Sequence, residues 1–254
     1  MIFRHWLREN ALLAVGYSIL LALNVVASVL YWPDLRDNIP AVIKMIPLQP
    51  LQDFFRAMDE YGFWAYVCFQ IFWKAAGVFG IAAAGLMGTG IVAREVDNRT
   101  AELLLSRPIS RASIFFQRWL AGAILLVVPM FLASAAVILL APRVDETIAP
   151  SVILSATAYV SLFVLAAYTL TAALSARFSH QMKAGIVVMG FMLLQFALYM
   201  IKQLWNYSLY NLIDLDPLIP ITNGIFPWTN CLLMGGAVLV FYGAAWWNFE
   251  RRDF

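Results

Sequence analysis

The amino-acid sequence predicts an all-α integral membrane protein with six transmembrane helices. Only 13% of its 254 residues are charged and 63% are hydrophobic, whereas a soluble chain carries roughly 25% charged residues. The charges gather between long apolar runs, and an apolar helix of about 20 residues is long enough to cross the bilayer core. No stretch has the composition of a soluble domain, so residues 1–254 are expected to form a single transmembrane domain.

The first ten residues, M-I-F-R-H-W-L-R-E-N, alternate apolar and basic side chains at helical spacing. This pattern predicts a short N-terminal interfacial helix on the membrane surface, with Trp6 at the level of the lipid headgroups and Arg4 and Arg8 toward the phosphates. The same residues could also be an ordinary basic flank that orients the first span. The two interpretations are compatible.

Six runs that hold almost no charge predict the membrane spans. Their approximate bounds are 11–32, 70–93, 115–141, 150–175, 184–202 and 231–249. An even number of spans places both chain ends on one side. Eleven of the 17 Lys and Arg residues fall on that side and five on the other, so the positive-inside rule predicts an N-in, C-in topology.

Residues 33–62 and 203–230 are the outer loops in this topology. The first is net acidic and punctuated by proline, and Leu51–Met58 within it could form a short surface helix. The second is too apolar for a simple loop and contains three prolines. We expect it to form re-entrant short helices that dip partly into the outer leaflet, where backbone must be buried in protein or line a wet cavity.

The second span has two unusual features. Lys74 interrupts its apolar run; the side chain can snorkel to the outer interface, or it can contact a substrate or a subunit. Small residues then recur every fourth position on one helix face, which lets another helix approach closely. The partner helix could lie inside this chain or in a second copy. These residues are Ala76, Gly80, Ala84 and Gly88.

Catalytic chemistry is missing from the sequence. The two histidines, His5 and His180, both fall at the predicted cytoplasmic surface, and no span carries a deep carboxylate. Cys68 and Cys231 are expected to be buried small residues, with a bridge between them as the alternative. No G-x-x-x-x-G-K-[ST] motif is present. We therefore expect no catalytic residue, no cofactor or metal bound by this chain, and, at a net charge of +2, no nucleic-acid partner.

The charged segment, Ala93–Ser113, is the exception to this apolar composition. Asn98 can cap a short helix that Pro108 would end. A helix of two turns is marginal alone, so its three leucines need a partner, either the protein's own helix ends or a groove in a soluble subunit. The seven charged residues are Arg94, Glu95, Asp97, Arg99, Glu102, Arg107 and Arg111.

This segment resembles the one that follows the second span in permeases of the ABC-2 class of ATP-binding-cassette exporters. Arg99 stands where glycine is common in that family, and F-E-R-R-D (Phe249–Asp253) is similar to the family's cytoplasmic ending. The residues that match the family pattern are Glu95, Thr100, Glu102, Leu103, Leu104, Leu105, Ser106, Pro108, Ser110 and Arg111.

The resemblance implies a permease subunit in a cell membrane of bacterial type. Two permease copies, as a homodimer, would pair with two ATPase subunits that hold the ATP and Mg, and an accessory extracytoplasmic protein could join them. Residues 94–111 would be the coupling helix that seats in the ATPase. The coupling residues implied are Arg94, Glu95, Thr100, Glu102, Leu103, Leu104, Arg107, Pro108 and Arg111.

Two other functions stay open at this point. The chain could be a membrane scaffold that recruits a cytoplasmic protein, or a permease-like component of a system that matures metal centres. An ion-coupled carrier is disfavoured because such proteins bury charged relays in their spans. The substrate is not specified: charge-free spans mildly favour a lipid-like molecule, a peptide or a drug.

Overall fold

A computed structural model describes residues 2–97 and 109–252, without the side chain of Glu95. Within these ranges the chain is helical with no strand. Six helices are long and apolar enough to cross a membrane: Ala11–Arg36, Gln49–Thr89, Arg111–Val144, Pro150–Arg177, Gln181–Met200 and Trp228–Glu250. The predicted all-α class is thereby confirmed, and the six candidate helices agree in number with the six predicted spans, whose bounds in a membrane stay a prediction.

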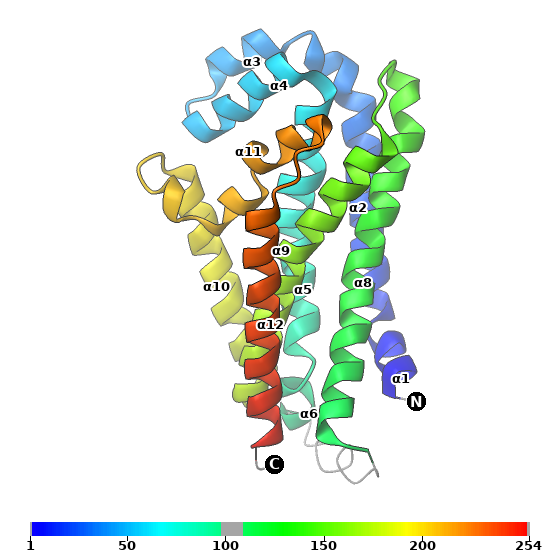
Figure 1. The fold of residues 1–254 in the computed structure, drawn as a ribbon, viewed down its shortest axis with the longest axis vertical. Coiled ribbons are helices and arrows are strands. Elements are labelled where there is room, and N and C mark those ends of the chain that lie inside the picture. Colours follow the sequence, from blue (N-terminus) through cyan, green and yellow to red (C-terminus); the bar gives the residue numbers. More distant parts are fainter. Residues whose placement is uncertain (1, 98–108, 253–254) are drawn as a thin grey trace.

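The helices form an elongated bundle whose long axis they follow (Figure 1). Both chain ends lie at one end of the bundle, together with α1 (Ile2–Glu9) and α6 (Ala93–Asp97), and we call this the terminal end. The opposite, distal end carries α3 (Ile39–Met45) and α11 (Leu215–Leu218). Which end faces the cytoplasm stays a prediction of the positive-inside rule.

The N-terminal helix α1 packs on the bundle through its apolar face. Trp6 is 1% exposed, and its ring lies 5.6 Å from the guanidinium carbon of Arg94 and 5.2 Å from that of Arg118. The prediction that Trp6 sits among lipid headgroups is therefore wrong. An aromatic face that attracts cations can find them inside the protein as well as at a membrane surface.

The second span is longer than its apolar run. Helix α4 (Gln49–Val67), the π-helix η1 (Cys68–Gly80) and α5 (Ile81–Thr89) follow one another without a loop. Gly62 breaks α4 with φ 62° and ψ −139°, a conformation that glycine alone adopts without strain. Much of the predicted outer loop 33–62 is thus helical, with proline in the first turn of α3 and of α4, where its missing N–H costs nothing.

Five further long helices complete the bundle. They are α2 (Ala11–Arg36), α8 (Arg111–Leu140, extended by the 3₁₀ turn η2, Ala141–Val144), α9 (Pro150–Arg177), α10 (Gln181–Met200) and α12 (Trp228–Glu250), with α2 preceding the second span. Between α10 and α12 the chain forms η3 (Trp205–Tyr207), η4 (Leu209–Ile213), α11 and η5 (Ile219–Asn223). Short helices are present where re-entrant ones were predicted, and their depth in a membrane stays a prediction.

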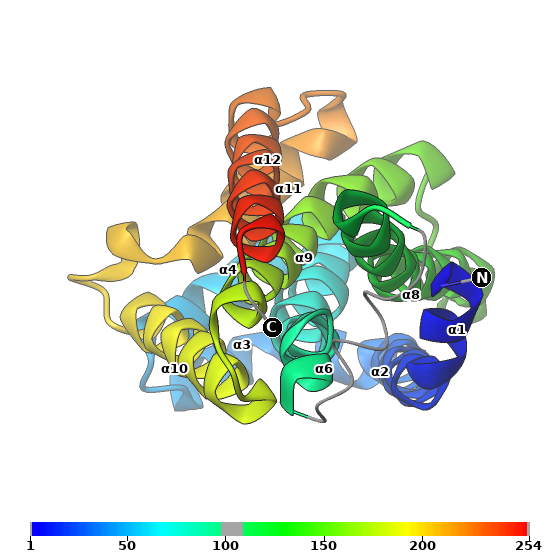
Figure 2. The same ribbon diagram turned by 90° about the horizontal axis from the view of Figure 1, so that it is seen from below.

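Helix α9 and the helix formed by η1 and α5 are the most buried of the candidate spans, and Figure 2 shows α9 in the middle of the bundle. The predicted small-residue stripe is buried here. A Cβ on Gly80 would lie 3.0 Å from Val164 Cγ2, and one on Gly88 would lie 2.6 Å from Thr171 Cβ. The stripe therefore packs against α9 of the same chain, one of the two partners that the sequence left open.

Helix α8 approaches α9 through a glycine that the sequence did not single out. A Cβ on Gly122 would lie 2.0 Å from the hydroxyl oxygen of Tyr168, so only glycine fits there. That hydroxyl donates to the Trp119 carbonyl at 3.2 Å. Hydroxyl groups of α9 also bond to α8: Thr157 Oγ1 lies 2.6 Å from Ser134 Oγ, and Trp119 Nε1 donates to Thr169 Oγ1 at 3.1 Å.

Candidate functional site

The charged segment lies at the terminal end of the bundle, between α5 and α8. Its first part forms α6, and its last residues lead into α8 at Arg111. The predicted residues Thr100, Glu102, Leu103, Leu104, Arg107 and Pro108 lie outside the described residues. Glu95 lies in α6, and its side chain is likewise outside the described part. Arg94 and Arg111, at the two borders, are described.

A single hydroxyl fixes the junction where α5 ends and α6 begins. Ser175 Oγ of α9 donates to the Thr89 carbonyl at 2.8 Å. The same oxygen accepts the backbone N–H of Val92 at 3.2 Å and of Ala93 at 2.9 Å. Ser175 is fully buried, so these three bonds satisfy backbone groups that water does not reach.

The opposite side of this junction is held by α1 and α8. The buried Arg118 of α8 donates from Nη1 to the Ile91 carbonyl at 2.9 Å. A Cβ on Gly90 would lie 3.0 Å from Arg94 Nη2 and 3.1 Å from Trp6 Cη2. The aromatic ring is therefore within 6 Å of two guanidinium groups and close to the Gly90 backbone, so α1, α6 and α8 meet at this ring.

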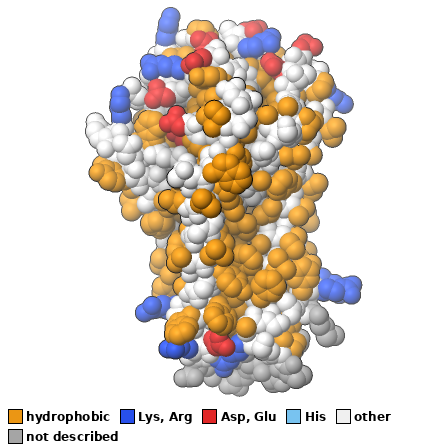
Figure 3. Space-filling view, in the orientation of Figure 1, with side chains coloured by type: hydrophobic (Ala, Val, Ile, Leu, Met, Phe, Trp, Pro, Cys, Tyr) orange, Lys and Arg blue, Asp and Glu red, His pale blue; other side chains and the backbone are white. Residues whose placement is uncertain are grey.

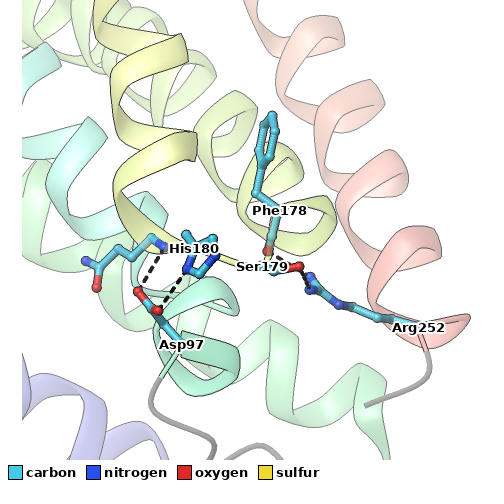
Figure 4. Close-up of polar contacts among 6 residues, drawn as sticks. Asp97, Phe178, Ser179, His180 and Arg252 are labelled. Atoms are coloured by element: carbon cyan, nitrogen blue, oxygen red, sulfur yellow. Dashed lines mark hydrogen bonds and ion pairs between the residues drawn. The ribbon is translucent and has the colours of Figure 1, made fainter.

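The C-terminal end of α6 contacts the start of α10. Asp97 Oδ1 lies 3.1 Å from His180 Nδ1, and Asp97 Oδ2 accepts the backbone N–H of Gln181 at 3.4 Å (Figure 4). The hydrogen bond from His180 and then that from Gln181 lower the pKa of the exposed Asp97 carboxyl. A carboxylate at a helix N-terminus also suits the helix dipole. Gln181 Nε2 completes the link by donating to Thr89 Oγ1 at 3.2 Å.

The C-terminal residues close the site from another direction. At the end of α9, Arg252 Nη1 donates to the Ala176 carbonyl at 2.7 Å and to the Phe178 carbonyl at 3.0 Å, the second of which is drawn in Figure 4. Arg111 Nη1 donates to the carbonyls of Glu250 at 3.1 Å and Arg252 at 2.8 Å. Arginine donors at helix C-termini satisfy carbonyl groups that lack intrahelical partners. The start of α8, the end of α9 and the end of α12 are thus held together.

The site consists of hydrogen bonds that join helix ends to the charged segment. Among the described residues, no three His, Cys, Asp or Glu side chains come together to hold a metal ion. The structure instead brings the ends of five helices to the charged segment, through Ser175, Arg118, Asp97 and Arg252. Sequence reasoning missed Ser175 and Trp6 as parts of this site, because a buried serine and an interfacial tryptophan are common in any membrane helix.

The other predicted residues lie away from this end. Lys74 is half-buried in η1 of the second span. Cys68 is buried, Cys231 is partly exposed, and both are free, so the bridge that the sequence allowed is not formed. The four residues of the small-residue stripe lie in the packing between the second span and α9 described above.

Comparisons with known proteins agree with this picture. A family model described as an ABC-2 family transporter protein matches residues 19–254, which is nearly the whole chain and includes the charged segment. A search for similar curated proteins finds none that matches.

Proposed function

Because the chain belongs to the ABC-2 family of transporter proteins, we propose that it is the permease subunit of an ATP-driven exporter. Two copies would pair with two ATPase subunits, which bind the ATP and Mg and hydrolyse the nucleotide. The cargo would be a lipid-like molecule, a peptide or a drug. The membrane would be the cell membrane, with the terminal end in the cytoplasm, as the positive-inside rule predicts.

The observation that carries this proposal is the attachment of the charged segment to the bundle. At one border of the segment, α6 is bonded to α10 and to Ser175 of α9, which also bonds the end of α5; the other border, at Arg111, is bonded to the end of α12. A soluble subunit that grips this segment would hold every helix that ends here. In the proposed exporter, energy from ATP hydrolysis would arrive through this contact.

The mechanism follows from these contacts. Closure of the ATPase dimer on ATP would move the two charged segments of the permease pair. Ser175 would pass the displacement of α6 to α9, and the Asp97–His180 contact would pass it to α10. Packed helices shift between discrete arrangements rather than deform continuously. The space between the two permeases would therefore change as a unit.

Charge reversal in the charged segment tests the proposal. The Glu102→Arg variant and the double variant Arg107→Glu, Arg111→Glu are expected to abolish the permease-dependent part of ATP hydrolysis in the complex with the copurified ATPase. Membrane insertion and yield should be unchanged, because even the double variant keeps nine of the eleven basic residues on the predicted cytoplasmic side, against five on the other. ATP hydrolysis by the purified complex and the amount of ATPase retained are the two measurements.

Arg143→Glu is the matched control, because Arg143 is exposed at the distal end. Normal coupling in the charged-segment variants would contradict the assignment. A soluble protein that copurifies and has no ATPase activity would favour the scaffold function instead.

A further inference from the structure

A cavity of about 300 Å³ lies at the distal end, between α4, the last turn of α10, and the segment that contains η3 and α11. One part of its wall is a continuous row of aromatic rings. The ring centroids of Phe54 and Tyr199 are 6.3 Å apart, and those of Tyr199 and Trp205 are 6.2 Å apart. Pro50, Ile219 and Pro220 add apolar surface. The volume is that of a small-molecule site.

The rest of the wall is acidic. Asp214 is only 6% exposed, and its Oδ1 caps α11 by accepting the Leu215 N–H at 2.7 Å. Asp216 and Asp53 line the same cavity, and Figure 3 shows acidic side chains, interspersed with basic ones, at this end of the bundle. Among the described ion pairs, Asp53 pairs with the exposed Arg56, whereas none involves Asp214 or Asp216.

A buried carboxylate without a cation is costly, because the protein interior solvates charge poorly. Burial first, and then the neighbouring Asp216 and Asp53, raise the pKa of Asp214 to about 6, against hydrogen bonds from the Leu215 N–H and the Tyr199 hydroxyl. Both charged groups that act on Asp214 are therefore negative. The titratable groups facing it from neighbouring elements are Tyr199 of α10, Asp53 and Tyr61 of α4, Cys68 of η1, and Asp216 of α11.

We propose that this cavity binds a small organic cation, an ammonium group carried on an apolar or aromatic body. The aromatic faces attract a cation, and the buried carboxylate pairs with it, while the apolar wall covers the rest of the molecule. A bare metal ion fits less well, since no described trio of ligating side chains is close enough to hold one. The binding goes beyond the proposed coupling function and needs neither nucleotide nor ATPase turnover.

The test uses the full-length chain in lipid nanodiscs, with any ATPase that copurifies and without nucleotide. Benzyltrimethylammonium is titrated at about pH 8, where Asp214 is ionised. Trp205 lines the cavity, so tryptophan fluorescence reports binding, and calorimetry measures it independently. Neopentylbenzene, in which carbon replaces the charged nitrogen, is the neutral comparison. The Trp205→Phe variant identifies the fluorescence change that comes from the cavity.

Asp214→Asn is the decisive variant, because asparagine still caps α11 but carries no charge. We expect it to weaken binding of the cation by at least about tenfold, the size of a lost charge-assisted bond. Asp145→Asn is the matched control: Asp145 does not line the cavity, and its left-handed backbone at φ 58° suits asparagine. That variant should bind within about twofold of the native chain.

Acidity supplies the second readout. A carboxylate with a raised pKa is protonated as the pH falls, so native binding should weaken between about pH 7 and pH 5, and the Asp214→Asn variant should lose most of that dependence. Cation binding that is equal in the native and Asp214→Asn chains would overturn the proposal. Equal affinity for the charged probe and its neutral analogue would overturn it as well.

Discussion

Trp6 shows how one side chain can join three helices. Its ring is enclosed by Arg94 and Arg118, whose guanidinium groups come from α6 and α8. A cation–π contact is worth about 0.5–2 kcal/mol, with the larger values where water is excluded. Because Trp6 is buried, its loss would also leave a void beneath the charged segment. The residue belongs to the candidate site although it is far from the charged segment in sequence.

Substitution of Trp6 separates these contributions. We expect Trp6→Ala to reduce permease-dependent ATP hydrolysis and to lower the unfolding free energy by about 3–5 kcal/mol, as for other buried aromatic residues. Trp6→Phe, which keeps an aromatic face for both cations, should recover most of the coupling. Trp247→Ala is the control, because Trp247 also stacks on an arginine but is 52% exposed. A coupling defect equal in the Phe and Ala variants would argue against the two cation contacts.

Ser175 is a second single residue that stabilises the α5–α6 junction, on the side opposite to Trp6. Ser175→Ala removes the partner of two backbone N–H groups and of one carbonyl, all described above as buried. Each buried group left unpaired costs about 1–3 kcal/mol. The variant should therefore lose thermal stability and coupling together, measured by unfolding in detergent and by ATP hydrolysis in the complex. Ser151→Ala, exposed at the other end of α9, should change neither.

At the scale of the elements, α9 is the helix against which the others are arranged. The second span approaches it through Gly80 of η1 and Gly88 of α5, and α8 approaches it through Gly122. Without a hydrophobic effect between helices in lipid, close backbone approach and interhelical hydrogen bonds are what hold such a bundle together. The small residues that face Thr171 and Tyr168 on α9 allow the close backbone approach, and the Tyr168 hydroxyl supplies an interhelical hydrogen bond.

Gly122→Ala tests this packing directly. The added methyl would lie 2.0 Å from the Tyr168 hydroxyl, so the helices must move apart, at a cost of about 1–3 kcal/mol. We expect a lower unfolding temperature in detergent, partly restored by Tyr168→Phe in the same chain. Gly236→Ala in α12 is the control, since its Cβ would meet no atom within 4 Å. An unchanged unfolding temperature for Gly122→Ala would mean that α8 and α9 are not closely packed in the membrane.

At the scale of the whole molecule, the sequence predicted what depends on composition. Charge-free runs identify six spans because charge is expelled from the bilayer core. The same rule says little about residues 33–62, where an acidic and proline-containing sequence forms α3 and α4. Such helices can lie in an interface without an apolar run. The break at Gly62 and the approach at Gly122 depend on neighbours that no local pattern reveals.

The candidate site also has a part that the sequence predicted and parts that only the fold reveals. The charged segment was found because seven charges stand between two spans, and the family match agrees with that resemblance. Its supports, Ser175 and Arg252, depend on which helix ends meet in space. The acidic cavity also went unpredicted, because Asp53 and Asp214 are separated by most of the chain and only the fold brings them to one wall.

The three bonds of Ser175 have a consequence for how force would travel. A glycine-containing turn between two helices, here at Gly90, would ordinarily behave as a soft hinge that absorbs a push. The Ser175 hydroxyl oxygen is hydrogen-bonded to residues before and after that turn, so the turn cannot bend unless these bonds break. In an exporter driven from the charged segment, little of the stroke would be lost to bending. The displacement of the charged segment would reach α9, the central helix of the bundle, almost undiminished.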